Sequence, residues 1–342
     1  MTAAVPGSAA DAAKPTPGLI RAGIIERFGE PQVLCTVRLP RPTRASGHAL
    51  VRVRAASVNY GETKIRRGLV PELGPPPLVL GSDLSGTVVE AEPGGRFRVG
   101  DEVYGIHFIG TYADYVSVPE ASLATKPMTV DHVRAAALPV AARTALVAIC
   151  EYAALRAGQR ILIHAAAGGV GHLAVQLARH RGAYVLGTAR TAHHPFLRNL
   201  GVDEPIDYTT VDFRSVARDV DVVLDLVGGE YGRRSLDCLR PSGLLLGAAL
   251  DPGVTEEDAD RRGRQFRWLG ATRLVRPLDV VRELVDAGQL TVHVERTYAL
   301  SELPAAHTHA ETGRVTGKLV ITIDDEPAMD RTHDRLSGTG RR

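Results

Sequence analysis

The sequence is short of cysteine and has no marked excess of charge. Three of its 342 residues are cysteine, and Cys35, Cys150 and Cys238 lie far apart with no CxxC pair among them. This spacing supports neither a disulfide framework nor a zinc site built on thiolates. The formal net charge is +2, which argues against a nucleic-acid or membrane-surface partner recognised through overall charge.

Long apolar runs and a secretory signal are also missing. No stretch reaches the roughly 20 apolar residues that a membrane-spanning helix needs. Residues 1–18 contain no basic segment followed by an apolar core, so we expect a disordered arm and not a signal peptide. Residues 324–342 are polar and are expected to form a disordered tail. Together these features predict a cytoplasmic protein.

The residues that are present indicate two domains with different patterns of apolar residues. The length and the 44% hydrophobic content suit an ordinary globular protein. Residues 19–139 contain short apolar runs broken by Gly and Pro, and residues 49–56, 84–91 and 112–118 alternate apolar and polar side chains as strands do. We therefore predict a β-rich, barrel-like domain over residues 19–139.

The texture changes after Pro139. A helical stretch is expected over residues 141–154, and strands then alternate with helices; the expected strands cover residues 160–164, 184–188, 220–226, 243–248 and 266–271. This alternation indicates an α/β domain with a doubly wound parallel sheet over residues 140–288. Residues 289–323 return to strands around one helix, which suggests that the nucleotide-binding fold is inserted into a split first domain.

A glycine-rich turn follows the first strand of this second domain. Residues 160–181 read RILIHAAAGGVGHLAVQLARHR, and the helix begins within residues 169–171. Gly168 would let backbone amides approach a pyrophosphate, and Gly171 would let the helix pack tightly on the strand. Ala166 replaces the first glycine of the usual GxGxxG pattern. The context between strand and helix predicts dinucleotide binding; the alternative is a tight turn without a ligand.

The next strand bears on the choice of cofactor. Folds that prefer NAD carry an acid at the end of the second strand, where it binds the ribose hydroxyls. Here Thr188 is followed by Ala189 and Arg190, with no Asp or Glu. A hydroxyl and a guanidinium suit a 2′-phosphate, so NADPH is favoured over NADH. The alternative is that Arg190 is a solvated loop residue.

Several segments, taken in order, resemble a known family. They are VNYGETKIRRG (58–68), GSDLSG (81–86), VGDEVYG (99–105), GTYADYV (110–116), LPVAARTA (138–145), IDY (206–208), DLVGG (225–229) and GKLVI (317–321). With the AAAGGVG turn, they are similar to the medium-chain dehydrogenase/reductase superfamily, in its zinc-independent quinone oxidoreductase (zeta-crystallin-like) branch.

The resemblance implies a GroES-like domain and a Rossmann domain, with the nicotinamide in the cleft between them. It also implies roles for matching residues: Asn59 and Thr144 at the nicotinamide and ribose; Ala166, Gly168, Gly169, Val170 and Gly171 at the pyrophosphate; Thr188, Arg190 and Tyr208 at the adenosine phosphate; Asp225, Val227, Gly228, Gly247, Ala248 and Lys318 beside the cofactor. Asp225 as a strand-end cap and Tyr208 as a packed aromatic are the alternatives. Members of the branch often pair subunits along the sheet edge, which leaves a homodimer open.

The chain departs from its zinc-dependent relatives. These carry a cysteine after the first-domain strand and a His-Glu pair in the segment that matches GSDLSG, whereas this chain has VNYG at 58–61 and Ser82-Asp83. Where some relatives insert a four-cysteine lobe, this chain has only residues 107–109. A catalytic zinc needs three protein ligands, so we predict no metal.

Without a metal, hydride addition to an electron-poor acceptor is favoured. The sequence predicts an NADPH-dependent reductase of a small quinone or conjugated enone. Tyr60 and Lys64 are candidate donors to the developing oxyanion; the alternatives are a packing aromatic and a surface lysine. Reduction of an enoyl thioester or of a secondary-metabolite intermediate, and a non-catalytic NADPH-binding role, remain open. The arginines of residues 261–276 could bind a phosphate-bearing or carrier-tethered substrate, or form a solvated face.

Overall fold

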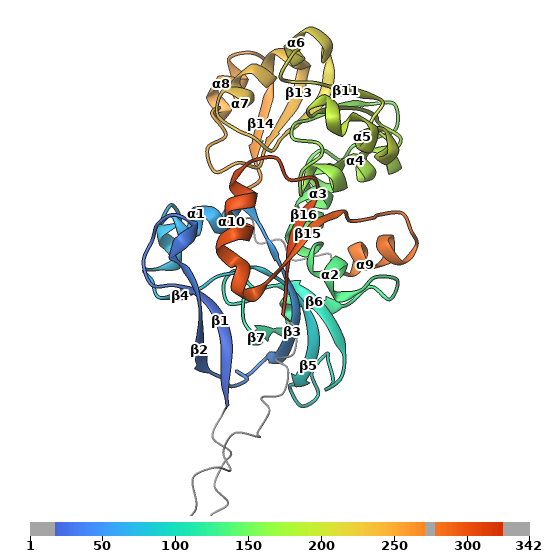
Figure 1. Cartoon of the computed structure of the whole chain (residues 1–342). Helices are drawn as coiled ribbons and strands as arrows, with labels where there is room; N and C mark the ends of the chain where they lie inside the picture. Colours follow the sequence, from blue (N-terminus) through green and yellow to red (C-terminus); the bar gives the residue numbers. More distant parts are fainter. Residues whose placement is uncertain (1–17, 271–277, 324–342) are drawn as a thin grey trace, which may run out of the picture.

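The computed structural model describes residues 18–270 and 278–323. Two sheet-bearing regions lie one above the other in the view of Figure 1, with α3 (Pro139–Leu146) between them. The predicted disordered segments 1–18 and 324–342 lie outside the described residues, apart from Gly18. Within the described ranges, no helix is long and apolar enough to cross a membrane.

The second region is built on a six-stranded parallel sheet. Its strands, in spatial order, are β11 (Glu204–Ile206), β10 (Tyr184–Thr188), β9 (Arg160–Ile163), β12 (Val220–Asp225), β13 (Leu239–Gly247) and β14 (Gln265–Trp268). The order reverses between β9 and β12, and ligands of such sheets bind beyond the strand ends at this point. The predicted doubly wound sheet is confirmed.

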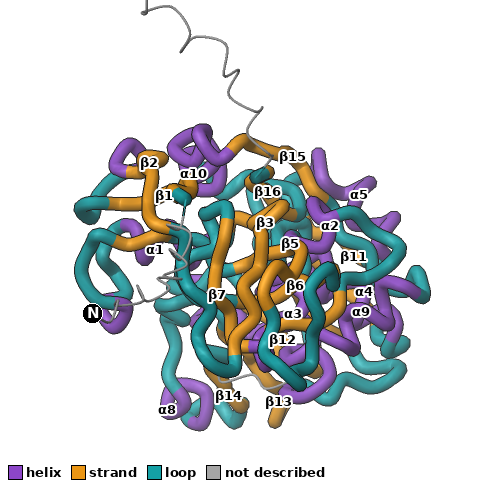
Figure 2. The backbone as a smooth tube through the Cα atoms, turned by 90° about the horizontal axis from the view of Figure 1, so that it is seen from below, coloured by secondary structure: helices purple, strands orange, loops and turns teal. Residues whose placement is uncertain are grey.

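The first region contains a seven-stranded sheet. Its strands are β15 (Val294–Ala299), β16 (Lys318–Thr322), β3 (His48–Val58), β5 (Asp83–Glu90), β6 (Glu102–Ile106) and β8 (Leu123–Thr125), and β7 (Tyr115–Pro119) also pairs with β3. Figure 2 shows β16 beside β3. Strand β16 is antiparallel to β3, with Leu319 opposite Val58, so this register places Lys318 next to the end of β3.

A smaller sheet and several short helices complete this region. Strand β1 pairs with β2 on one side and with β4 on the other; they span Leu19–Ile25, Leu34–Pro40 and Leu78–Val79. The expected β-rich domain is GroES-like. Its helices are α1 (Tyr60–Arg66), α2 (His132–Ala136) and α10 (Leu303–Glu311). Short 3₁₀ turns occur at Pro31–Val33, Pro71–Leu73, Glu120–Ser122 and Leu300–Glu302.

The helix predicted over residues 141–154 begins earlier and changes type. It starts at Pro139, because a proline at the first helical position loses only a donor that would have no partner. From Val147 to Tyr152 it continues as a π-helix. The other helices of the second region are α4 (Gly171–His180), α5 (His194–Leu200), α6 (Phe213–Val216), α7 (Glu230–Ser235), α8 (Glu256–Asp260) and α9 (Leu278–Asp286), with 3₁₀ turns at Thr191–His193 and Leu236–Cys238.

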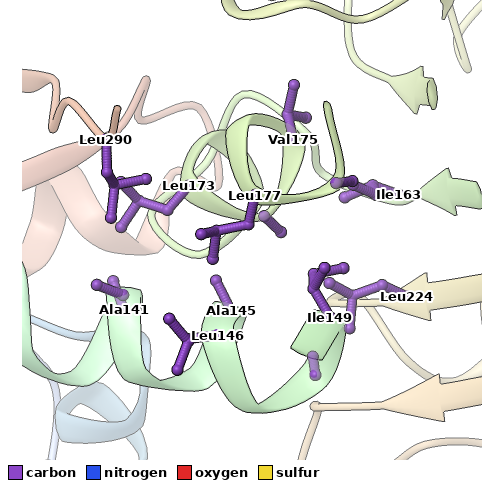
Figure 3. Packing of buried hydrophobic residues seen from close by; sticks show 14 of the residues in the cluster. Ala141, Ala145, Leu146, Ile149, Ile163, Leu173, Val175, Leu177, Leu224 and Leu290 are labelled. Atoms are coloured by element: carbon purple, nitrogen blue, oxygen red, sulfur yellow. The ribbon is translucent and has the colours of Figure 1, made fainter. Parts of the chain in front are cut away.

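The largest core cluster lies between α3, α4 and the parallel sheet. Figure 3 shows Leu173 and Leu177 of α4 above Ala141 and Ala145 of α3. Small side chains on α3 let the two helices approach, and each leucine removed from water contributes on the order of 2 kcal/mol. This packing holds the start of α4, and with it the glycine turn, against the junction of the two regions.

Candidate functional site

The glycine turn connects the end of β9 to the start of α4. Ala165 has a left-handed backbone with φ of +48°, a rare conformation for a residue with a side chain. A Cβ built on Gly171 would lie 2.3 Å from the carbonyl oxygen of Ala165 and 2.8 Å from the Cα of Ala166. Any side chain at position 171 would therefore collide with backbone. The helix can start this close to the strand only with glycine.

Three successive amides of the turn are available to a ligand. The Gly168 amide donates to the Ala165 carbonyl at 2.9 Å. Among the described residues, the amides of Gly169, Val170 and Gly171 donate to no protein acceptor. They stand at the N-terminal end of α4, where unpaired N–H groups and the helix dipole favour an anion. A pyrophosphate fits this donor set.

Strand β16 runs directly past this turn. The Gly317 amide donates to the Ala167 carbonyl at 2.8 Å, and a Cβ on Gly169 would lie 3.1 Å from Cδ of Lys318. Lys318 is buried, and its ammonium donates to Oδ1 of Asn59 at 2.6 Å and to the Val58 carbonyl at 3.1 Å. The lysine stem therefore links the turn to the first residue after β3. Burial lowers the pKa of Lys318.

Asp83, at the start of β5, is the acceptor at the centre of a buried polar cluster. Its Oδ2 accepts from Ser57 at 2.6 Å and from Nδ2 of Asn59 at 3.0 Å, and it lies 3.6 Å from the Lys318 ammonium. Its Oδ1 accepts from the Val140 amide in the first turn of α3 at 2.8 Å. Asp83 thus joins both regions through one fully buried carboxylate.

Glu62 is a second buried carboxylate in the same cluster. It accepts from the Asn59 amide at 3.1 Å, the Ser82 amide at 2.9 Å and the Tyr112 hydroxyl at 2.5 Å. Burial raises the pKa of Glu62, while its bonds to Tyr112 and Asn59 lower it. The Tyr112 hydroxyl also lies 3.4 Å from Nε2 of the buried His307. The sequence analysis named Asn59 and Lys318 of this cluster but gave no role to its two carboxylates, although charged residues inside apolar segments were the available signal.

The two predicted proton donors lie on α1, next to Asn59. Tyr60 is 60% exposed, and the Lys64 ammonium lies 4.7 Å from the centre of its ring. This contact is a cation–π interaction. It leaves the Tyr60 hydroxyl outside the buried cluster of Asp83 and Glu62. Their roles as donors stay predictions.

At the other end of the site, Arg190 and Tyr208 come together. Nε of Arg190 donates to the Tyr208 hydroxyl at 3.3 Å. They meet because the parallel strands β10 and β11 pair Thr188 with Ile206, so the loops that follow lie side by side. Asp207 lies in the same loops, but both of its oxygens accept from Thr191 and Thr209, and these bonds hold the pKa of its carboxyl far below the usual range.

Thr188 differs from its neighbours because it is buried. Its hydroxyl accepts from the Ala165 amide at 3.2 Å and contacts Nδ1 of His164 at 3.1 Å. Ala166, also buried, donates its amide to the Thr188 carbonyl at 3.1 Å. The resemblance placed Thr188 near the adenosine phosphate, whereas its hydroxyl is hydrogen-bonded to the glycine turn.

The remaining expected cofactor residues lie at strand ends or on α3. Oδ1 of Asp225 accepts from the Val227 amide at 2.9 Å and the Gly228 amide at 3.0 Å, which is the strand-end cap considered above. Its Oδ2 is buried without a partner in the described structure, and burial raises the pKa of this carboxyl. Gly247 on β13 lies opposite Asp225 on β12, and the Ala248 amide donates to the Asp225 carbonyl. Thr144 donates to the Val140 carbonyl at 2.7 Å. Their contacts with a cofactor stay predictions.

The arginine-rich stretch is largely engaged in local contacts. Arg261 donates to Asp258 at 2.9 Å and Arg262 to Asp237 at 2.5 Å. Arg264 donates to two carbonyls, and Arg267 lies 6.0 Å from the centre of the Tyr152 ring. These contacts favour the solvated-face interpretation. Two members, Arg273 and Arg276, lie outside the described residues.

The positions that carry metal ligands in zinc-dependent relatives have other contacts in this chain. In the described ranges, no three His, Cys, Asp or Glu side chains gather closely enough to hold a metal ion. Asp83 stands in the segment where those relatives carry their His-Glu pair, and its oxygens accept from Ser57, Asn59 and Val140.

Two family models match the chain. The model for the "Alcohol dehydrogenase GroES-like domain" matches residues 45–128, and the "Zinc-binding dehydrogenase" model matches residues 200–321. Among curated proteins, the 2-haloacrylate reductase of a Burkholderia species is 31% identical over 329 residues, which cover 89% of this chain and 99% of the reductase. Polyketide synthase GfsB of Streptomyces halstedii is 36% identical over 298 residues, covering 83% of this chain. The chain matches only 5% of that synthase's length.

Solved structures agree with these matches. The quinone oxidoreductase from Coxiella burnetii has a TM-score of 0.83 and 35% identity, and the match covers 90% of this chain and all of that one. The Escherichia coli quinone oxidoreductase, whose structure is a complex with NADPH, has a TM-score of 0.81 and 26% identity. That match covers 89% of this chain and all of the E. coli chain.

Proposed function

This chain belongs to the medium-chain dehydrogenase/reductase superfamily, in its quinone oxidoreductase branch, and from this membership we propose that it transfers hydride from NADPH to a small quinone or conjugated enone without a metal ion. It is an oxidoreductase of that family; the cofactor, the acceptor and the metal independence are the proposed parts.

One observation carries the proposal: the glycine turn and the buried polar cluster are in direct contact through Lys318. The lysine stem lies against Gly169, where a pyrophosphate would bind, and its ammonium ends at Asn59. Two features that the chain separates by about a hundred residues therefore form one site. A dinucleotide that extends from the turn along Lys318 would bring its nicotinamide to Asn59.

The preference for NADPH rests on Arg190 and Tyr208. A guanidinium can bind a phosphate in bidentate fashion, and the adjacent hydroxyl adds a donor. Asp207, the acid that directly follows β11, accepts hydrogen bonds from Thr191 and Thr209, so it is not free to accept from ribose hydroxyls. The bound NADPH in the E. coli relative supports the same choice.

The protein groups would bind and orient the reactants. When bound, NADPH would supply the hydride. The free amides at the start of α4 would hold its pyrophosphate, and Lys318 would hold Asn59 beside the reacting ring. Tyr60 or Lys64 would donate a hydrogen bond or a proton to the acceptor oxygen as charge develops there. The Asp83 oxygens already accept hydrogen bonds from Ser57, Asn59 and Val140, which supports the proposed independence of a metal.

The proposal is tested by NADPH oxidation with a panel of quinones and conjugated enones, before and after treatment with a chelator. We expect turnover with at least one acceptor and no loss of rate after chelation.

We also expect Arg190→Gln to raise the KM for NADPH by about 10- to 100-fold, because one charge-assisted contact is lost, and to leave the KM for NADH unchanged. Arg198→Gln, on the neighbouring α5, is the matched control. Tight NADPH binding without turnover on any acceptor would favour the non-catalytic role.

An enoyl thioester is the second candidate acceptor. It is favoured by the 36% identity to a segment of a polyketide synthase, while the 2-haloacrylate reductase relative favours a free conjugated acid. A comparison of crotonyl-pantetheine with crotonate and an enone separates them. A kcat/KM at least tenfold higher for the thioester would replace the leading acceptor with this one.

A further inference from the structure

His164, which follows the last residue of β9, is fully buried and packs against two aromatic rings. Its ring centre is 4.6 Å from that of Phe213 and 5.1 Å from that of Tyr231, both in edge-to-face geometry. Its Nδ1 lies 3.1 Å from the Thr188 hydroxyl and its Nε2 lies 3.0 Å from the Ser235 hydroxyl. Neither the family resemblance stated above nor the proposed mechanism gives this ring a role.

Counting donors determines which nitrogen of His164 carries the proton. The Ser235 hydroxyl donates to the Tyr231 carbonyl at 2.6 Å, and a carbonyl can only accept. Ser235 must therefore accept from Nε2–H of His164, and Nδ1 keeps its lone pair. Thr188 then donates its hydroxyl proton to Nδ1. Burial lowers the pKa of His164 to about 3, so the ring is neutral at physiological pH.

Because Thr188 donates its hydroxyl proton to His164, its hydroxyl oxygen can accept a hydrogen bond from the glycine turn. The Ala165 amide donates to it at 3.2 Å, and the Ala166 amide donates to the Thr188 carbonyl at 3.1 Å. Ala165 is the residue with a φ of +48°, a conformation that costs about 1–2 kcal/mol and persists only when neighbours hold it. The hydrogen bonds of His164 and Thr188 thus end on this strained residue.

We propose that His164 and Thr188 are positioning residues that hold the glycine turn in the shape that binds the pyrophosphate, and that Thr188 does not read the 2′-phosphate. The inference rests on the proposed binding of a dinucleotide. Because NADH and NADPH share the pyrophosphate, a displaced turn weakens the binding of both. Loss of a direct contact to the 2′-phosphate would weaken NADPH alone.

The test is a titration of the full chain with NADPH and with NADH, followed by the fluorescence of the reduced nicotinamide. Thr188→Val keeps the volume and removes the hydroxyl, and we expect it to raise both dissociation constants by a similar factor of about ten. Thr188→Ser keeps the hydroxyl and should restore both values to within about twofold of the parent chain.

Ser235→Ala is the matched control for a merely structural role. It removes the acceptor of the other His164 nitrogen, which faces away from the turn. We expect a drop in Tm comparable to that of Thr188→Val, with both dissociation constants unchanged. If Thr188→Val does not fold, Thr188→Cys takes its place, because a thiol is a weaker donor of similar size. We expect Thr188→Cys to raise both dissociation constants by a similar, smaller factor.

The outcomes are distinct. A loss confined to NADPH in Thr188→Val overturns the inference and makes Thr188 a phosphate contact. Equal weakening by Thr188→Val and Ser235→Ala overturns it as well, since general loosening would then explain both. Failure of the parent chain to bind either dinucleotide is a failure of the proposed function, and it is seen before any variant is made.

Discussion

Single residues set how closely the parts of this site approach one another. Gly171 lies against the Ala165 carbonyl with no room for a Cβ, whereas a Cβ on Gly169 would meet the flexible stem of Lys318. The two glycine positions of one motif thus differ in whether they can accept a side chain. A backbone neighbour cannot move without moving the turn, but a lysine stem can shift by a few tenths of an ångström.

We expect Gly171→Ala to lower the free energy of unfolding by about 1–3 kcal/mol, because the added methyl overpacks against backbone. It should also weaken NADPH binding by at least about tenfold, since the free amides move with the turn. Urea unfolding and the nicotinamide fluorescence titration measure the two effects. Gly61→Ala is the stability control: nothing lies within 4 Å of its added Cβ, so unfolding free energy should stay the same or rise by about 0.5–1 kcal/mol. Similar behaviour of the two variants would contradict the close-packing account.

At the scale of elements, the start of β5 ties the two regions together. Its first residue, Asp83, accepts hydrogen bonds from the end of β3, from Asn59 before α1 and from the first turn of α3. Strand β16 adds Lys318 to the same point. Helix α4 makes an independent link, since Gln176 exchanges hydrogen bonds with Thr291 at 2.8 and 2.9 Å in the segment before β15.

We expect Asp83→Asn to lower the free energy of unfolding by about 3 kcal/mol and to lower kcat. An amide NH₂ at either position would face another donor, and the buried Lys318 would lose the nearer of its two carboxylates, with only Glu62 left. Asp279→Asn, in a half-exposed pair with Arg96, should cost at most about 1 kcal/mol. Equal losses in the two variants, measured by urea unfolding, would remove the special role of Asp83.

At the scale of the whole molecule, three fully buried histidines make stability depend on pH. Burial lowers the pKa of His164 and His307 to about 3 and that of His172 to about 4. The tautomer of His172 is also determined, because its Nδ1 lies 2.8 Å from the Gly168 carbonyl and its Nε2 accepts from the His293 amide. Each ring must be neutral to keep its place.

We expect the free energy of unfolding to fall as pH falls from 6.5 toward 3. Each folded-state pKa is below the unfolded value of about 6.5, so the unfolded chain binds more protons in this range, and the stability present above pH 6.5 is lost as pH decreases. At pH 5.5 the loss is about 1.4 kcal/mol for each ring, or about 4 kcal/mol for three. Glu62 and Asp225, whose pKa values burial raises, oppose part of it.

Urea unfolding at pH 7.5, 6.5 and 5.5 measures this dependence. The variant His307→Leu removes one titrating ring and should lose about 1 kcal/mol less stability between pH 6.5 and 5.5 than the parent chain. An unchanged free energy across this range, or a slope in His307→Leu equal to that of the parent, would contradict the assignment of neutral buried rings.

Local patterns predicted most of the elements around the site. Strand β10 lies at residues 184–188 as expected, and β9 ends one residue earlier than expected. Both strands could be predicted because strands of a parallel sheet covered on both faces are continuous apolar runs. The expected strand at residues 112–118 lies at Tyr115–Pro119. The predicted strand begins at Tyr112 because the apolar and polar side chains alternate from there. Tyr112 itself lies outside β7, and its hydroxyl donates to the buried Glu62. A pattern of period two does not distinguish a strand from a buried segment beside it.

Three local features of this protein follow from short stretches of sequence: the glycine turn, the alternation of strand and helix, and the lack of an acid directly after Thr188. Each depends on neighbours within a few residues. Only the tertiary structure decided that Lys318 reaches Asn59, that Asp83 joins β3 to α3, and that Thr188 serves the turn through His164. These contacts span 23 to 259 positions of the chain, and strand pairing and register create them. Register follows from the packing of whole sheets, which no short stretch of residues encodes.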